Sequence, residues 1–322
     1  MTPGSVAKAR VLVTGATGLV GSSLVGCLLS AGAEVHALVL PEPEPESDLV
    51  RSGALGRVRV HTGRLEDPAA VAVAVQAARP RFVFHLGAQP LVGVARAHPV
   101  ATFEANVRGT WALLEACRTM SDPPVVAVAS SDKAYGASAK LPYVETDPLA
   151  GSEPYEASKA ITDILAQTYA RTYGLPTRIA RCGNIYGIGD WNWSRIVPGT
   201  IRSLLRGERP VLRSDGTPVR DYIHVDDVVA GYLALATTES VSPGEAFNFS
   251  SGERLTVREV VDSVTGAVGV ALQPVVLNEA RGEIAAQYLD SAKARKTLGW
   301  EPRRRMRESL PDIVAWYREL LA

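Results

Sequence analysis

The 322-residue chain contains only three cysteines, Cys27, Cys117 and Cys182, and they are widely separated. Their spacing fits neither a zinc site nor a disulfide framework, so we expect neither a structural zinc ion nor disulfide bonds. No apolar run reaches the roughly 20 residues that a membrane-spanning helix needs, and the short N-terminus lacks a signal-peptide pattern. We therefore expect a cytoplasmic protein in a reducing environment.

The chain also lacks an excess of charge, because 34 lysines and arginines balance 34 aspartates and glutamates. This balance gives no electrostatic reason to expect nucleic acid or an anionic membrane as a partner. No repeat of the solenoid type is present. The length allows one large domain or two smaller ones with an ample core.

What the chain does contain is a glycine-rich turn near its start. Residues 10–14 form a β-rich run, Gly15, Gly18 and Gly21 follow, and residues 19–30 have a helical pattern. Strand, glycine-rich turn and helix in this order are typical of a dinucleotide site, where the backbone approaches a pyrophosphate at the helix N-terminus.

The alternation of strands and helices continues along the chain and predicts an α/β fold with a Rossmann-like, doubly wound parallel sheet. We expect a dinucleotide-binding domain over residues 1–183, to which residues 224–250 return. Residues 184–322 are expected to form mainly a smaller, interleaved α/β lobe that binds the substrate. Further strands are predicted over 35–40, 57–61, 82–86, 125–129, 177–181 and 247–249, helices over 68–78, 103–120, 155–173, 196–206, 227–237, 256–266 and 306–321, and loops over 41–46 and 183–195.

Residues 130–159 carry side chains whose chemistry is linked. Tyr155 and Lys159 are four residues apart, so on a helix they share one face. An ammonium beside a phenol lowers the pKa of the phenol, which can then take a proton from an alcohol. Ser131, Asp132 and Lys133 follow an apolar run at the carboxyl end of a predicted strand, where open α/β sheets bind ligands. We expect the five side chains to face one pocket, although a Tyr-x-x-x-Lys pair also occurs on helix surfaces and Ser-Ser-Asp-Lys can form a helix cap or a turn.

These motifs occur together with Asn184, Arg220-Asp221 and Leu298-Gly299-Trp300. The combination covers nearly the whole chain and resembles the extended short-chain dehydrogenase/reductase family, the NAD-dependent epimerases and dehydratases that modify nucleotide sugars. Within this family the chain is most similar to the CDP-glucose 4,6-dehydratases, on residues 85–92, 131–133 and 183–198.

The resemblance implies a 4,6-dehydratase (a hydro-lyase) that acts on a nucleotide-diphosphate hexose. Tyr155, aided by Lys159, would remove the O4 proton while hydride passes from C4 to NAD, and Ser131 would hydrogen-bond the same oxygen. Lys133, alone or with Asp132, would then take the C5 proton while Asp132 protonates the departing 6-hydroxyl. Hydride would return to C6, giving a 4-keto-6-deoxy sugar. A lysine can act as this base only if burial or a nearby cation lowers its pKa.

The resemblance also implies which residues bind the ligands, with no metal among them. Asn184, Arg195 and Arg220 would join Gln89 and Ser131 on the nucleotide sugar, and Arg220 would lie on its diphosphate, since guanidinium groups pair well with such oxyanions. The alternative for these residues is a surface or loop-bracing role. NAD, with NADP as the other possibility, would contact Gly15, Thr17, Gly18, Leu19, Val20, Leu65, Leu86, Ala88, Gln89, Tyr155 and Lys159.

Four further residues have structural alternatives. Asn106 matches an asparagine that the family has at a helix kink. His85, at the end of a predicted strand, is expected to be a core residue with satisfied hydrogen bonds. Trp191 and Trp193 could stack on a base or sugar, or could pack within the smaller lobe.

The chain departs from the family pattern where the cofactor and phosphate are expected. Arg64 stands where the family commonly has an aspartate that contacts the adenine amine, and Leu40 offers neither an acid nor a base to the ribose. Ala285 and Ala286 occupy a stretch where relatives often carry a phosphate-binding arginine, which Arg281 could replace.

Two other functions fit the motifs. A nucleotide-sugar 4-epimerase shares Tyr155 and Lys159 but needs no Asp132–Lys133 pair, and a dinucleotide-binding protein without turnover would account for the departures. We also expect a homodimer formed through the helices over 103–120 and 155–173. Trp111 belongs to an apolar stripe there, although a core-facing helix gives the same pattern.

Overall fold

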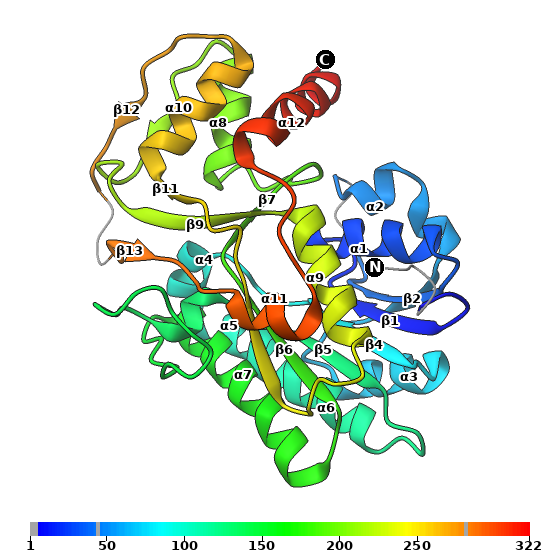
Figure 1. The fold of residues 1–322 in the computed structure, drawn as a ribbon. Coiled ribbons are helices and arrows are strands. Elements are labelled where there is room, and N and C mark those ends of the chain that lie inside the picture. Colours follow the sequence, from blue (N-terminus) through cyan, green and yellow to red (C-terminus); the bar gives the residue numbers. More distant parts are fainter. Residues whose placement is uncertain (1–5, 43–45, 280–282) are drawn as a thin grey trace.

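The computed structural model describes residues 6–42, 46–279 and 283–322. Arg281 and part of the predicted 41–46 loop therefore lie outside the described residues. The centre of the molecule is a seven-stranded parallel sheet in the order β10-β6-β5-β4-β1-β2-β3 (Figure 1). Its strands are β1 (Arg10–Thr14), β2 (Glu34–Val39), β3 (Arg59–Thr62), β4 (Phe82–His85), β5 (Val125–Ala129), β6 (Thr177–Cys182) and β10 (Glu245–Phe249).

Helices cover both faces of this sheet because successive strand side chains point to opposite sides. In β1, Val11 and Val13 pack in one apolar cluster with α1 (Leu19–Ser30) and α9 (Val225–Thr237). Leu12 packs in the other, with α3 (Pro68–Ala78), α6 (Gly109–Arg118) and α7 (Pro154–Tyr173). The predicted doubly wound α/β fold is confirmed.

The predicted helix over 103–120 is confirmed as a helical run that continues to Arg118, but it contains a π-helical turn that the sequence analysis did not predict. The chain forms α5 (Pro99–Phe103), a π-helical turn η3 (Glu104–Arg108) and then α6. Asn106 lies in this turn and is buried, and its side chain is hydrogen-bonded to the backbone of Gln89 and to Ser158. Wide turns of this kind are frequent at functional sites. Here the turn lets an asparagine brace the loop after β4.

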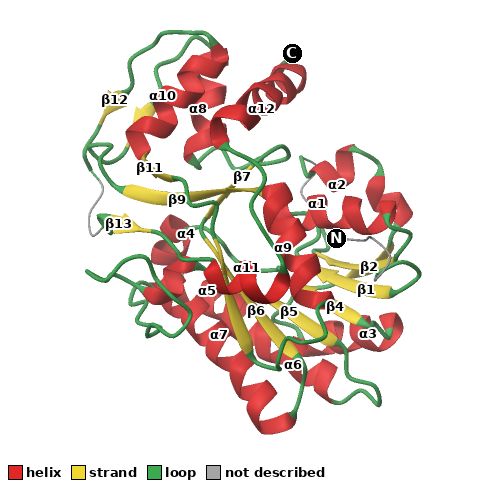
Figure 2. Cartoon of the chain, in the orientation of Figure 1, coloured by secondary structure: helices red, strands yellow, loops and turns green. Residues whose placement is uncertain are grey.

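The smaller lobe is built around β9 (Val219–His224), as Figure 2 shows in its upper part. β9 pairs with β7 (Asn184–Tyr186), β11 (Arg254–Thr256) and β13 (Ala286–Gln287). The prediction of a loop over 183–195 is therefore wrong at β7. Three helices share one apolar cluster above this sheet, namely α8 (Ile196–Leu205), α10 (Val257–Val268) and α12 (Met306–Leu321).

The remaining elements are short. β8 (Val211–Leu212) pairs with β12 (Val275–Val276) in the lobe, while α11 (Ala292–Leu298) packs beside β10 of the large sheet. The others are α2 (Asp48–Arg51), α4 (Val92–Ala97) and the turns η2 (Ala54–Arg57) and η4 (Asp132–Tyr135).

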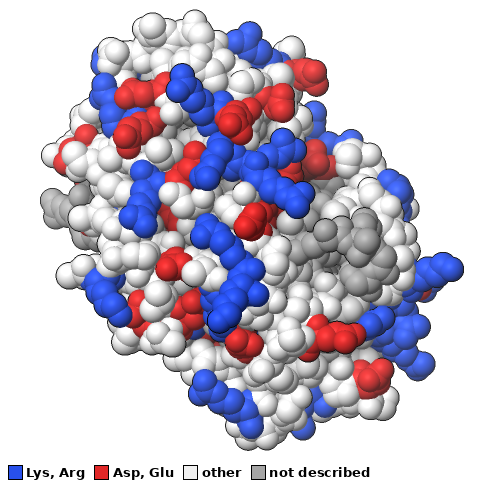
Figure 3. Space-filling view, in the orientation of Figure 1, with Lys and Arg blue, Asp and Glu red and all other residues white. Residues whose placement is uncertain are grey.

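Basic and acidic side chains are intermixed on the face of the molecule seen in Figure 3. Within the described ranges, no helix has the length and apolar character needed to cross a bilayer. Trp111 on α6 and Ile164 on α7 are partly exposed, at 44% and 50%. The homodimer expected through these helices stays a prediction. Light scattering can test it by measuring the molar mass of the protein in solution.

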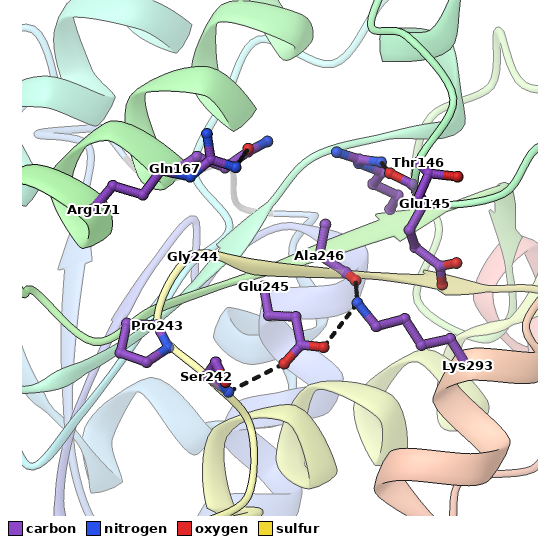
Figure 4. A pocket seen from close by; sticks show the side chains of 11 residues that line it. Glu145, Thr146, Gln167, Arg171, Ser242, Pro243, Gly244, Glu245, Ala246 and Lys293 are labelled. Atoms are coloured by element: carbon purple, nitrogen blue, oxygen red, sulfur yellow. Dashed lines mark hydrogen bonds and ion pairs between the residues drawn. The ribbon is translucent and has the colours of Figure 1, made fainter.

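Side chains from other segments cover the outer edge of β10. Lys293 donates a hydrogen bond of 2.8 Å to the Ala246 carbonyl and pairs with Glu245 at 2.9 Å (Figure 4). Glu145 accepts a hydrogen bond of 2.8 Å from the Asn248 amide. These contacts satisfy edge groups that could otherwise pair with another chain. The side chains of Glu145, Glu245 and Lys293 line a small pocket of about 320 Å³. We interpret this pocket as part of the cover over the outer edge of β10.

A buried ion pair fixes α7 on the sheet. The Arg181 guanidinium of β6 meets the Asp163 carboxylate of α7 through two contacts, Nε to Oδ2 at 2.8 Å and Nη2 to Oδ1 at 3.0 Å. Both side chains are almost fully buried. Arg181 also donates a hydrogen bond of 2.8 Å to the hydroxyl of Tyr135. The position of Tyr155 and Lys159, which α7 carries, depends on this pair.

We expect Asp163→Asn to lower the free energy of unfolding by about 3–5 kcal/mol, because it leaves the Arg181 charge buried without its partner. The exposed Arg258–Asp262 pair, at 3.3 Å, provides the matched control. Asp262→Asn should change the free energy of unfolding by less than about 1 kcal/mol. Urea unfolding of the three proteins measures both values, and equal effects of the two variants would contradict the role given to Asp163.

Candidate active site

A cleft of about 1210 Å³ lies at the carboxyl ends of the strands, between the large sheet and the smaller lobe. All the candidate residues predicted from the sequence line it, so the fold brings both motif regions and the lobe residues together. They are Gly15, Thr17, Gly18, Leu19, Val20, Leu65, Leu86, Ala88, Gln89, Ser131, Asp132, Lys133, Tyr155, Lys159, Asn184, Arg195 and Arg220.

The glycine-rich turn forms a tight connection between β1 and α1. Gly15 has φ +68°, and a Cβ on it would lie 2.6 Å from the Gly87 amide nitrogen. A Cβ on Gly21 would lie 2.0 Å from the Gly15 carbonyl oxygen. No side chain caps the start of α1, where Gly18 is the N-cap residue. Its first backbone N–H groups therefore line the cleft as an anion site, which fits the pyrophosphate of NAD.

Two of the residues that depart from the family pattern also lie in the cleft, whereas Ala286 lies in the smaller lobe and is not among the residues that line the cleft. Leu40 and Arg64 line it, and Arg64 is partly exposed with its Nη1 3.4 Å from Glu66. Ala286 is part of β13, opposite Val219 of β9.

Ser131, Asp132 and Lys133 follow β5 in a tight helical turn. The Ser131 hydroxyl donates a hydrogen bond of 3.0 Å to Asp132 Oδ1 and accepts one of 3.2 Å from the Lys133 amide. Lys133 Nζ lies 3.0 Å from Asp132 Oδ2. Asp132 is 1% exposed. An acid and a base are thus in direct contact at the end of the strand.

Tyr155 and Lys159 lie next to this turn. Lys159 Nζ donates a hydrogen bond of 2.8 Å to the Ala129 carbonyl at the end of β5, and burial lowers the pKa of Lys159 to about 8. Burial, followed by the negative charge of Asp132, raises the pKa of Tyr155 to about 12, while a hydrogen bond with Ser131 opposes this shift. The expectation that Lys159 makes the phenol acidic does not hold for the protein alone. The physical reason is that burial desolvates the phenolate, and the Asp132 carboxylate disfavours it further.

Gln287 is a site residue that the sequence analysis missed. It lies on β13, is fully buried, and its amide bonds both to Lys133 Nζ and to the Asp132 carbonyl. A lone glutamine more than 150 positions from its partners carries no local sequence signal.

The arginines expected to bind the diphosphate are already paired. Arg220 Nη2 lies 2.9 Å from Glu283, and its Nη1 donates to the Val219 carbonyl. Arg195 lies 3.0 Å from Asp190. A guanidinium has five N–H donors, so each arginine retains donors for an oxyanion in the cleft.

His85 is a satisfied core residue, as expected. Its two ring nitrogens are hydrogen-bonded with the hydroxyls of Thr14 and Thr110 at 2.9 and 3.0 Å. Burial lowers the pKa of His85 to about 3, so it is neutral at physiological pH. Trp191 packs edge-on against Trp193, and only Trp193 also lines the cleft.

We expect Gly21→Ala to weaken NAD binding more than about tenfold, because the added methyl group collides with the turn that receives the pyrophosphate. Gly26→Ala, on the same helix, is the matched control, since a Cβ there meets no atom within 4 Å. It should bind NAD normally and gain up to about 1 kcal/mol of stability. Calorimetric titration with NAD and thermal unfolding measure these effects, and normal NAD binding by Gly21→Ala would show that the turn does not hold the cofactor.

Known proteins resemble this chain over most of its length. The dTDP-glucose 4,6-dehydratase of Streptomyces antibioticus is 35% identical over an alignment that covers 96% of this chain and 92% of that protein. The CDP-glucose 4,6-dehydratase of Salmonella typhimurium is 31% identical, with 96% and 90% covered. These relatives bear out the family resemblance inferred from the motifs.

Solved structures agree with these matches. The UDP-glucose 4-epimerase of Thermotoga maritima, solved with UDP-glucose, superposes with a TM-score of 0.89 at 30% identity, covering 97% of this chain and 99% of that one. A double mutant of the dTDP-glucose 4,6-dehydratase of Streptomyces venezuelae, solved with NAD, gives 0.88 at 30% identity, covering 96% and 97%. NAD is thus confirmed as the cofactor of the group. Residues 11–250 match the family described as NAD dependent epimerase/dehydratase, and the chain belongs to that family of nucleotide-sugar enzymes.

Proposed function

We propose that the chain is a 4,6-dehydratase of nucleotide-diphosphate hexoses, which removes water from the sugar and leaves a 4-keto-6-deoxy product. The observation that carries this proposal is the pair of the buried Asp132 and the partly buried Lys133, 3.0 Å apart and beside Tyr155 in one cleft. Inversion at C4 needs only that the sugar be oxidised and reduced on opposite faces. Loss of water additionally needs a base for the C5 proton and an acid for the 6-hydroxyl, and this pair can supply both.

Oxidation at C4 requires a base for the O4 proton, and Tyr155 is placed for it. The hydrogen bond with Ser131 favours the phenolate, whereas burial and Asp132 oppose it. Bound NAD supplies a hydrogen acceptor at C4 and a donor at C6, and its ring brings a positive charge. Lys159 adds a second positive charge from the same helix face. The phenolate thus forms when the cleft is filled, and Ser131 holds the sugar oxygen.

The elimination step uses the contact between Lys133 and Asp132. Transfer of one proton from Lys133 Nζ to Asp132 Oδ2 turns the ion pair into a neutral amine and a carboxylic acid. The amine can then take the C5 proton, made acidic by the 4-ketone, and the acid can protonate the 6-hydroxyl as it leaves as water.

Binding of the nucleotide sugar is assigned to the smaller lobe, mainly residues 184–322, as proposed from the sequence. Arg220 and Arg195 supply guanidinium groups for the diphosphate, and Asn184 and Gln89 supply amides that line the same cleft. Glu283, the partner of Arg220, is partly exposed, with 32% of its side chain accessible. It can therefore move aside when an oxyanion binds.

The product identifies the reaction. We expect incubation with CDP-, GDP-, UDP- and dTDP-hexoses to give, with at least one donor, a nucleotide sugar lighter by one water. In deuterated water the product should carry deuterium at C5. A 4-epimerase, the alternative favoured by the similarity to the Thermotoga maritima enzyme, would give an isomer of unchanged mass without exchange at C5. Mass spectrometry distinguishes the outcomes, and an unexchanged isomer as the product would refute the dehydratase proposal.

Two variants should stop the reaction at different points. We expect Lys133→Met to lower product formation about 100-fold or more while reduced cofactor accumulates on the enzyme, because C4 oxidation needs no Lys133. Tyr155→Phe should lower turnover by a similar factor without reduced cofactor, since it removes the first base. Single-turnover absorbance of the reduced nicotinamide separates the two. Product formation by Lys133→Met at the wild-type rate would remove Lys133 from the reaction.

A further inference from the structure

Gln287 joins the smaller lobe to the acid–base pair. Its side chain is fully buried, and its Oε1 accepts a hydrogen bond from Lys133 Nζ. Its Nε2 donates a hydrogen bond of 3.0 Å to the main-chain carbonyl of Asp132. Gln287 reaches the pair from β13 of the smaller lobe and is not itself among the residues that line the cleft.

The orientation of the Gln287 amide follows from its partners. A lysine ammonium only donates hydrogen bonds, and a main-chain carbonyl only accepts them. The oxygen of the amide must therefore face Lys133, and the nitrogen must face Asp132. The reversed amide would place two donors against each other and two acceptors against each other, on a side chain that is itself fully buried.

The backbone around Gln287 is held from two sides. On one side β13 pairs with β9, with Gln287 opposite Arg220. On the other side, the Tyr143 amide donates to the Tyr288 carbonyl at 3.0 Å, and the Asp290 amide donates to the Tyr143 carbonyl at 2.9 Å. The side chain consequently starts from a fixed point, which a residue on a free loop would lack.

We propose that Gln287 is a positioning residue for the elimination step, which holds the Lys133 amine against Asp132 and directs it to C5 of the sugar. This inference rests on the proposed dehydratase function. A lysine side chain has four rotatable bonds and fixes its own amine poorly. Asp132 and Gln287 contact Nζ from two directions, so these two contacts set the direction that remains for the nitrogen, toward the cleft, when Lys133 acts as the neutral base.

The same geometry makes the effect specific to one step. Ser131 and Tyr155, which serve C4 oxidation, have no hydrogen bond to Gln287, whereas Lys133 does. Loss of the amide should therefore leave binding and C4 oxidation intact and slow the removal of the C5 proton. A residue that only stabilised the fold would not separate these steps.

Gln287→Met tests this role, because methionine has a similar length and makes neither hydrogen bond. With the best hexose donor at saturation, we expect about 100-fold slower release of dehydrated product, the order of loss that a misplacement of about 1 Å causes. KM should stay within about threefold of wild type, and reduced cofactor should accumulate in single turnovers. Gln287→Glu, which keeps the shape, is the second variant. Its carboxylate should retain the proton on Lys133 and give the same accumulation.

Tyr288→Leu is the matched control on the neighbouring position. The Arg254 guanidinium carbon lies 4.1 Å from the centre of the Tyr288 ring, and the hydrogen bonds of the Lys133 amine go to Asp132 and Gln287, not to Tyr288. Its variant should release product at the wild-type rate, and circular dichroism should show folded protein for all three variants. Equal losses in the Gln287 and Tyr288 variants would assign the effect to the strand and overturn the inference.

The two proposals fail in different ways. If wild type forms the keto sugar and both Gln287 variants form it as fast, the positioning role is wrong and the dehydratase function stands. If wild type forms no dehydrated product from any of the hexoses, both proposals are wrong.

Discussion

The placement of α7 on the sheet determines the chemistry of the cleft. Lys159 donates a hydrogen bond to the Ala129 carbonyl where β5 ends, and Asp163, four residues further along, forms the buried pair with Arg181 of β6. Both polar contacts can form together in only one position of the helix along and around its axis. Losing either contact would leave a buried charge without a partner, which is costly. In that position Tyr155 lies beside Ser131. These two contacts thus set the distance between the phenol and the acid–base pair.

This placement has an electrostatic cost that the protein alone does not offset. Burial and the Asp132 carboxylate raise the pKa of Tyr155 to about 12, and burial lowers the pKa of Lys159 to about 8, so both charged forms are disfavoured. A base of this kind becomes effective when a positive charge enters the cleft next to it. In the proposed reaction, proton removal is thereby tied to occupancy of the cofactor site. Without a bound hydride acceptor, a phenolate in the cleft could not contribute to oxidation of the sugar.

Sequence reasoning succeeded where the determining signal is local. β1, α1, α3, β5 and α12 have the predicted bounds, because each depends on a glycine turn, a cap or an apolar period within a few residues; Asp67 caps α3, for example, and Pro68 starts it. β7 and β13 were missed because strands of two or three residues exist only through pairing with β9. Gln287 was missed for the same reason, because it lies on β13. The raised pKa of Tyr155 could not be predicted either, since it depends on burial by segments that are far from Tyr155 in the sequence.

The fold is equally close to a dehydratase and to an epimerase, with TM-scores of 0.88 and 0.89, so it cannot choose between the two reactions. In either proposed reaction, the tyrosine, the lysine and the dinucleotide turn would serve oxidation at C4. The choice must therefore lie in side chains that act after the ketone has formed. In the proposed reaction those are Asp132 and Lys133 in the turn after β5, and among the residues that the structure describes Gln287 is the one lobe residue bonded to both. In the proposed reaction, the smaller lobe supplies more than a surface for the nucleotide, because it also holds the base that commits the ketone to loss of water.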